Sequence, residues 1–130
     1  MPPDSDQFLF PGDDVSFPQD GPTSGSIARA GPDTFNLPAI GTYQVMFNVG
    51  VFDRGQLILT LNGTPLPYTG VETSSFPISQ LVGTFLVTTT VTDSSLSVRN
   101  PSDSGIEVNV ASFDGGNAPV SAHLVITQIR

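Results

Sequence analysis

The chain contains no cysteine, no tryptophan and no lysine, and its only cationic side chains are four arginines. Without cysteine, a disulfide framework, a thiolate zinc site and a cysteine nucleophile are all excluded. Twelve acidic residues give a formal net charge of −8 at pH 7, so the chain lacks the clustered cations that bind nucleic acid or an anionic membrane surface. No apolar run reaches membrane-spanning length either. We therefore expect no nucleic-acid partner and no insertion into a membrane.

Groups suited to catalysis are also scarce. The chain has a single histidine, His123, and two glutamates, Glu72 and Glu107, that lie far apart in the sequence. It has no Gly-x-Ser-x-Gly motif and no phosphate- or dinucleotide-binding motif. A calcium loop could form among the aspartates of the first 20 residues, but their spacing matches no EF-hand and a solvated acidic segment is the favoured interpretation. We therefore expect a protein that is not an enzyme, with no catalytic residue, cofactor or metal.

The sequence has a strong two-residue alternation of apolar side chains, which is clearest in the segment GTYQVMFNVGV at residues 41–51. Such alternation of β-branched and aromatic residues is typical of a strand that buries one face. A helix would scatter these side chains around its surface. The predicted buried face consists of Tyr43, Val45, Phe47, Val49 and Val51.

Further short segments repeat this pattern, with turn residues between them. Asn62-Gly63 predicts a tight hairpin, two prolines place residues 64–68 at a sheet edge, and residues 70–77 resemble a polar loop. We expect an all-β antiparallel sandwich or jelly roll at residues 15–130, preceded by a flexible acidic arm at residues 1–14. The other predicted strands are 7–10, 15–17, 26–30, 34–37, 56–62, 78–93, 95–100, 106–112 and 120–129.

Two of the predicted strands, 78–93 and 120–129, carry apolar residues on both faces. A monomeric sandwich needs only one apolar face per strand, so the second face predicts an oligomer that associates through the sheet holding the two termini. His123, alone on its strand, is interpreted as a packed or interface side chain. The predicted interface residues are Val82, Leu86, Val125, Ile129 and His123.

Four segments also resemble a known family: TFNLPAIGTYQVMFNVGV, GQLILTLNGTPLPYTG, QLVGTFLVTTTVTDSSLSVRNPS and PVSAHLVITQIR. Together they are similar to the C-terminal globular domain of the Bacillus collagen-like exosporium glycoprotein (BclA) and its relatives in bacterial and large-virus collagen-like proteins. The resemblance covers about residues 15–130. It implies a ten-stranded jelly roll of the tumour-necrosis-factor and complement type, assembled as a homotrimer.

The resemblance implies a structural trimerisation and display head without enzymatic activity, exposed on a spore exosporium, a cell or a virion. Its partner would be a collagen-like stalk, although this chain contains no Gly-X-Y repeat. The alternative is a trimeric adhesin tip that binds a carbohydrate or a surface receptor. The candidate ligand residues for that alternative are Arg54, Tyr68, Asp114 and Asn117.

Overall fold

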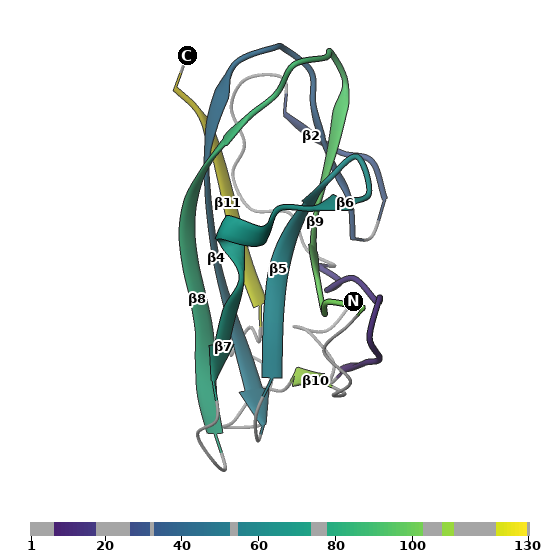
Figure 1. Cartoon of the computed structure of the whole chain (residues 1–130), viewed down its shortest axis with the longest axis vertical. Helices are drawn as coiled ribbons and strands as arrows, with labels where there is room; N and C mark the ends of the chain where they lie inside the picture. Colours follow the sequence, from purple (N-terminus) through teal and green to yellow (C-terminus); the bar gives the residue numbers. More distant parts are fainter. Residues whose placement is uncertain are drawn as a thin grey trace.

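The computed structural model describes residues 7–17, 27–31, 33–52, 55–73, 78–102, 108–110 and 122–129. These residues form antiparallel strands and a single turn of 3-10 helix, η1 (Figure 1). The expectation of an all-β fold is therefore confirmed. The elements are β1 Gln7–Leu9, β2 Ala28–Arg29, β3 Phe35–Leu37, β4 Thr42–Phe52, β5 Gly55–Leu61, β6 Thr64–Pro65, η1 Pro67–Thr69, β7 Val71–Thr73, β8 Ile78–Thr88, β9 Ser94–Arg99, β10 Val108–Val110 and β11 Ala122–Gln128.

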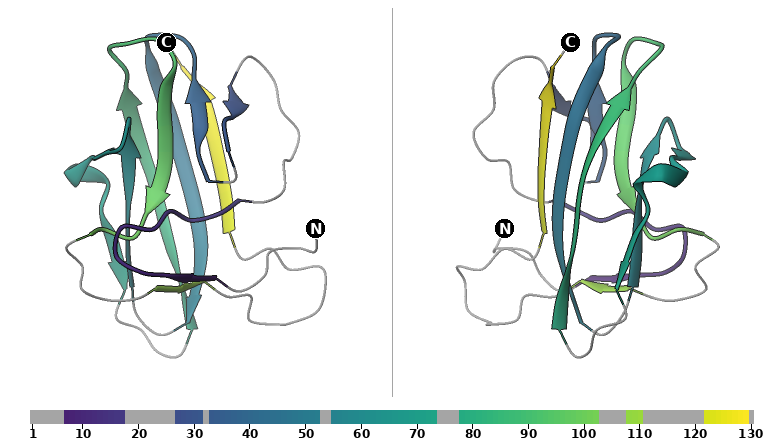
Figure 2. Two further views of the ribbon diagram at one scale, coloured as in Figure 1. Left: turned by 90° about the vertical axis from the view of Figure 1, so that its right-hand side faces the viewer. Right: turned by 60° about the vertical axis from the view of Figure 1, so that its left-hand side comes forward.

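The strands are arranged in two sheets, which we call the β4 sheet and the β5 sheet. In the β4 sheet, β4 pairs with β8 on one side and with β11 and β10 on the other, and β1 pairs with β10. In the β5 sheet the order is β2, β3, β9, β5, and the far edge of β5 pairs with both β6 and β7. Figure 2 shows β8, β4 and β11 side by side, with β9 and β5 in the other layer.

The strand pairs are nested around the segment that links β5 to β7. The innermost pair is the hairpin of β5 with β6, followed outward by β5 with β7, β4 with β8 and β3 with β9. β1, near the N-terminus, likewise pairs with β10 in the C-terminal part. Outside that hairpin, these pairs join the first half of the chain to the second half in reverse order, while β4 also pairs with β11 and β5 also pairs with β9.

The core lies between the two sheets and is built from the inward side of each strand. All five residues of the predicted buried face of β4 have no exposed surface, which confirms that prediction. Strands of the β5 sheet supply the aliphatic side chains that pack against them, as expected where two sheets interdigitate. The buried residues of the β5 sheet include Leu37, Leu57, Leu59, Leu96 and Val98.

The start of β4 is held by hydrogen bonds that explain the Gly-Thr-Tyr sequence there. The buried hydroxyl of Tyr43 donates to the carbonyl of Ala39 (2.6 Å) and accepts from its N–H (3.2 Å). The N–H of Gly41 donates to the side-chain hydroxyl of Thr89 (3.1 Å). The backbone N–H of Thr89 in turn donates to the Gly41 carbonyl (2.9 Å). Since a buried hydroxyl needs a partner, these contacts fix the turn before β4 against the chain that follows β8.

Three strand predictions need correction. Residues 70–77 contain β7, which pairs with the first three residues of β5 but is too short to show an alternation. β8 ends at Thr88 instead of residue 93, because residues 90–93 form bends that end with Asp93 at a φ of 56°. Residues 15–17 form no strand, although Val15 and Phe17 are buried.

The predicted boundary at residue 14 does not coincide with a boundary in the packing. β1 belongs to the β4 sheet, and Leu9 is fully buried in the core. Asn100, also fully buried, donates from its side-chain amide to the Leu9 carbonyl (2.8 Å). Residues 7–14 are therefore part of the sandwich, whereas residues 1–6 of the predicted arm lie outside the described residues.

Gly83 offers a direct test of the core packing. A Cβ atom at this position would lie 2.5 Å from the ring of Phe85 and 2.9 Å from that of Phe47, which is fully buried. We expect Gly83→Ala to lower the free energy of unfolding by about 1–3 kcal/mol through overpacking. Gly70→Ala is the matched control, because its nearest neighbour would be 3.6 Å away. Denaturant unfolding measures both, and equal losses would contradict the packing described.

Candidate interaction surface

The outward side chains of β8, β4 and β11 form a continuous surface, which we call the β8–β4–β11 outer face. These residues alternate with the core residues, and the strand register arranges them in rows across the three strands. The last row is completed by Ile129, whose N–H donates to the Thr42 carbonyl (2.9 Å). The rows are Val82–Asn48–His123, Thr84–Met46–Val125, Leu86–Gln44–Thr127 and Thr88–Thr42–Ile129.

Large apolar side chains are concentrated on this face. Single exposed apolar residues are normal on a protein surface, whereas a contiguous group marks an interaction site. Five of the nine large apolar side chains that are exposed among the described residues belong to this face, with exposed fractions of 43–53%. They are Met46, Val82, Leu86, Val125 and Ile129.

The structure brings all of the predicted interface residues together on this one face. Val82 and Leu86 project from β8, whereas His123, Val125 and Ile129 lie along β11 and its end. The face belongs to the sheet that holds β1 and β11, the first and last strands described. Sequence reasoning missed Met46, which the register places beside Val125 on this face. That these residues form an interface remains a prediction.

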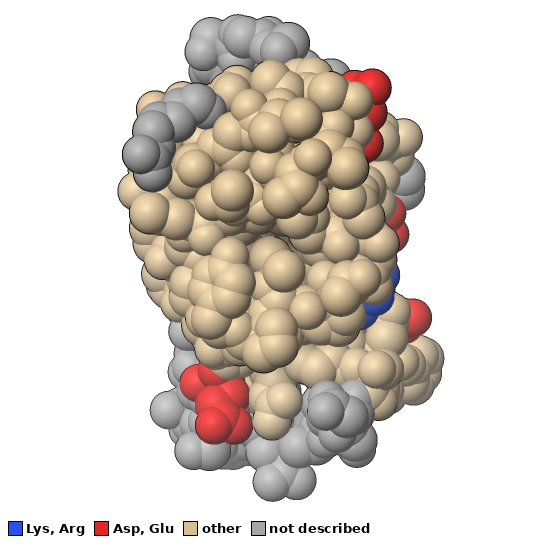
Figure 3. Space-filling model, turned by 45° about the horizontal axis from the view of Figure 1, so that its top comes forward, with Lys and Arg blue, Asp and Glu red and all other residues tan. Residues whose placement is uncertain are grey.

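The described residues of the β8–β4–β11 outer face include no acidic side chain and no arginine, and His123 is their only titratable group. The chain as a whole has a net charge of −8, although only 12% of its residues are charged. Figure 3 shows another side of the molecule, where the charged residues lie near the outline and leave a broad uncharged area. The described charged residues, all off this face, are Asp13, Asp14, Arg29, Asp33, Glu72, Asp93 and Arg99.

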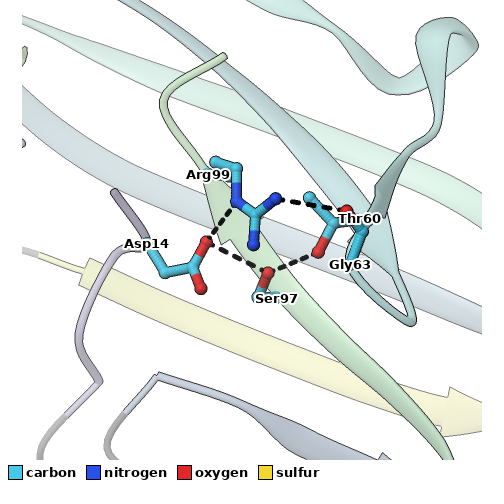
Figure 4. A network of polar contacts seen from close by, with 5 residues as sticks. All are labelled: Asp14, Thr60, Gly63, Ser97 and Arg99. Carbon is cyan, nitrogen blue, oxygen red and sulfur yellow. Dashed lines mark hydrogen bonds and ion pairs between the residues drawn. The ribbon is translucent and has the colours of Figure 1, made fainter. Parts of the chain in front are cut away.

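The outer side of the β5 sheet has a different character, because the chain covers part of it with a polar network (Figure 4). The Nε of Arg99 donates to Asp14 (2.8 Å), and the hydroxyl of Ser97 donates to the same carboxylate oxygen (3.2 Å). Ser97 is also hydrogen-bonded to Thr60, and both residues are buried. Arg99 further donates to the Gly63 carbonyl (3.3 Å). The segment that follows β1 thus covers part of the outer side of the β5 sheet, and Asp14 binds it there.

The candidate ligand residues of the alternative function are not assembled into a site by the described residues. Tyr68 is exposed, but its hydroxyl donates to the Leu86 carbonyl (2.8 Å) and its ring packs edge-on against Phe85. Tyr68 therefore covers the edge of β8 next to Leu86. Arg54, Asp114 and Asn117 lie outside the described residues.

No metal site was found where the chain is described: no group of three or more metal-ligating side chains comes together there. Of the acidic residues considered for a calcium loop, Asp13 and Asp14 are described and the others are not. Within the described ranges, no helix is long and apolar enough to cross a membrane.

Comparison with known proteins assigns the chain to no family. No protein-family model matches the sequence, and no curated protein matches it.

The ion pair between Asp14 and Arg99 should contribute measurably to stability. Arg99→Met keeps most of the aliphatic stem but leaves the partly buried carboxylate of Asp14 without its cation. We expect the free energy of unfolding to fall by about 1–3 kcal/mol, as for a buried charge that loses its hydrogen-bonded partner. Asp14→Asn combined with Arg99→Met should cost less than the sum of the two single changes. Strictly additive losses in urea unfolding would show that the pair is not coupled.

Asp33 should destabilise the fold when it is ionised. Burial raises the pKa of its carboxyl group, and the carboxylate of Asp14 raises it further. Folding therefore favours the neutral acid. The stability that the neutral carboxyl group of Asp33 gives relative to the ionised form is fully present below the unfolded-state pKa and is lost as the pH rises through the folded-state pKa. We expect Asp33→Asn to raise the free energy of unfolding modestly at pH 7 and to have no such advantage at pH 3. An advantage of equal size at both pH values would contradict this cause.

Proposed function

We propose that the chain is a non-enzymatic trimerisation and display head that associates through the β8–β4–β11 outer face. The observation that carries this proposal is an uncharged surface, three strands wide, that exposes five large apolar side chains on the outside of the sandwich. The core residues of β4 need no second partner, because they are already buried between the sheets. The outward apolar side chains therefore require a different explanation, and burial against another molecule supplies it.

Charge favours a second copy of the same chain as the occupant of this face. Each copy has a net charge of −8, so copies that approach through charged surfaces repel one another. Contact through an uncharged face avoids placing like charges opposite each other. An anionic membrane is disfavoured because the described part of the face offers no cation. A copy of this chain, in contrast, offers a surface that is also uncharged and exposes the same apolar side chains.

The arrangement of the apolar residues supports a closed ring. One apolar column, Val82 and Leu86, runs along β8, and another, Val125 and Ile129, runs along β11. β4 separates them with a mostly polar column. A cyclic assembly uses two different patches on each copy, one for each neighbour, and two unlike columns provide such a pair. The nested strand pairs support a jelly roll, and the resemblance to trimeric jelly-roll heads supports three copies.

The display role and the collagen-like stalk follow from the resemblance to the exosporium glycoprotein family. Three chains held by a trimeric head have their adjoining segments in register. This raises the effective concentration of the three segments for one another, which aids the winding of a collagen triple helix. We place such a head at the surface of a spore, a cell or a virion. The adhesin alternative has less support, because among its candidate residues only Tyr68 is described and its hydroxyl is engaged by β8.

The decisive test compares two valines with nearly equal exposure. Val125 lies on the β8–β4–β11 outer face (50% exposed), and Val91 lies in the bends after β8 (52% exposed). Val125→Glu would bury an unpaired charge in the assembly, which costs about 3–5 kcal/mol, whereas Val91→Glu would leave its charge in solvent. We expect light scattering on a sizing column to give three chains for the wild type and for Val91→Glu, and one chain for Val125→Glu.

Circular dichroism provides the control, since both variants should keep the β-sheet spectrum of the wild type. A wild-type mass of one chain would overturn the proposed assembly. A trimer that persists in folded Val125→Glu would show that the copies associate through another surface.

A further inference from the structure

His123 is the only histidine in the chain, and it lies within the proposed interface. It is exposed on β11, where the register places it opposite Asn48, with Val82 beyond on β8. Val125 is the next outward residue along the same strand. His123 therefore extends the apolar column of β11 with a group that changes its charge between neutral and mildly acidic pH.

We propose that His123 makes the assembly sensitive to pH, so that the copies associate at neutral pH and separate when the imidazole becomes protonated. This inference rests on the proposed function, because it requires the β8–β4–β11 outer face to be covered by another copy. A neutral imidazole can be buried against apolar side chains if its nitrogens find hydrogen bonds. A protonated imidazole in the same place carries a charge whose desolvation opposes association.

The described surroundings of His123 offer nothing that would compensate such a charge. From β4 it is faced by Asn48 and, in the next row, Met46, and from β8 by Val82. On its own strand the outward neighbour is Val125. Of these only Asn48 is polar, and its amide can accept a hydrogen bond but carries no charge. In the assembly the opposite face is built from the same uncharged set of described side chains.

The acidic residues of the chain should act in the opposite direction. As the pH falls, carboxylates take up protons and the net charge of −8 becomes smaller, which reduces the repulsion between copies. Protonation of Asp33 should also favour the folded state, because burial raises its pKa. Separation of the copies in mild acid therefore requires a group that gains charge inside the interface, and His123 is the one such group on the described face.

Proton linkage gives the sign of the expected effect. If each imidazole must be neutral for association, protons bind to the separated copies and not to the assembly, so the association constant of the trimer falls as the pH falls. The three copies contribute three imidazoles, and their effects on the association constant multiply.

The test measures the mass of the full chain in solution at pH 7.5 and pH 5, at one protein concentration and one ionic strength. We expect the wild type to change from three chains to one across this range. His123→Gln, which is polar but does not titrate, should remain a trimer at both pH values. His123→Arg, which is charged at both, should be a monomer at both, with a β-sheet spectrum that shows it is folded.

The outcomes separate this inference from the proposed function. A wild type that is a trimer at both pH values overturns the pH dependence and leaves the trimeric head intact. A His123→Gln variant that separates at pH 5 as the wild type does also overturns it, because the titrating group would then be another residue. A wild type that is a monomer at pH 7.5 overturns the proposed assembly and the present inference with it.

Discussion

The pairing of β4 with its neighbours is the constraint on which the rest of this structure depends. All eleven residues of β4 pair with β8, and the other edge of β4 pairs with β11 and β10. One face of β4 supplies the largest group of fully buried side chains, whereas the other supplies the middle column of the β8–β4–β11 outer face. A shift of register by one residue would exchange these two faces. The core and the β8–β4–β11 outer face are therefore set by the same backbone hydrogen bonds.

The outer sides of the two sheets differ in how far the chain covers them. On the β5 sheet, Thr60 and Ser97 are covered by the segment that carries Asp14, and Arg99 joins the cover to the sheet. That side is thus covered in part by the chain itself. On the β4 sheet, aliphatic side chains remain half exposed and the described residues supply no cover. This contrast within one molecule is a second reason why we propose the β4 sheet as the side that meets another copy.

The errors in the sequence-based description have local physical causes. β7 was missed because three residues are too few to display a period of two. Residues 15–17 were expected to form a strand, yet Val15 and Phe17 enter the core from a segment without regular strand pairing. Met46 was missed because a single methionine between Gln44 and Asn48 shows no apolar pattern along its own strand. Its significance appears only across the sheet, where it lies beside Val125.

The sequence by itself determined that the protein is all-β and which side chains of β4 are buried, because the side-chain period of a strand is a local property of the backbone. It also showed that β8 and β11 are apolar on both faces. Only the tertiary structure decided that the second faces of these strands lie in one plane on either side of β4. It also decided that Asp14 meets Arg99, 85 residues away. Which strands pair, and in which register, depends on contacts between distant parts of the chain, and no local pattern encodes them.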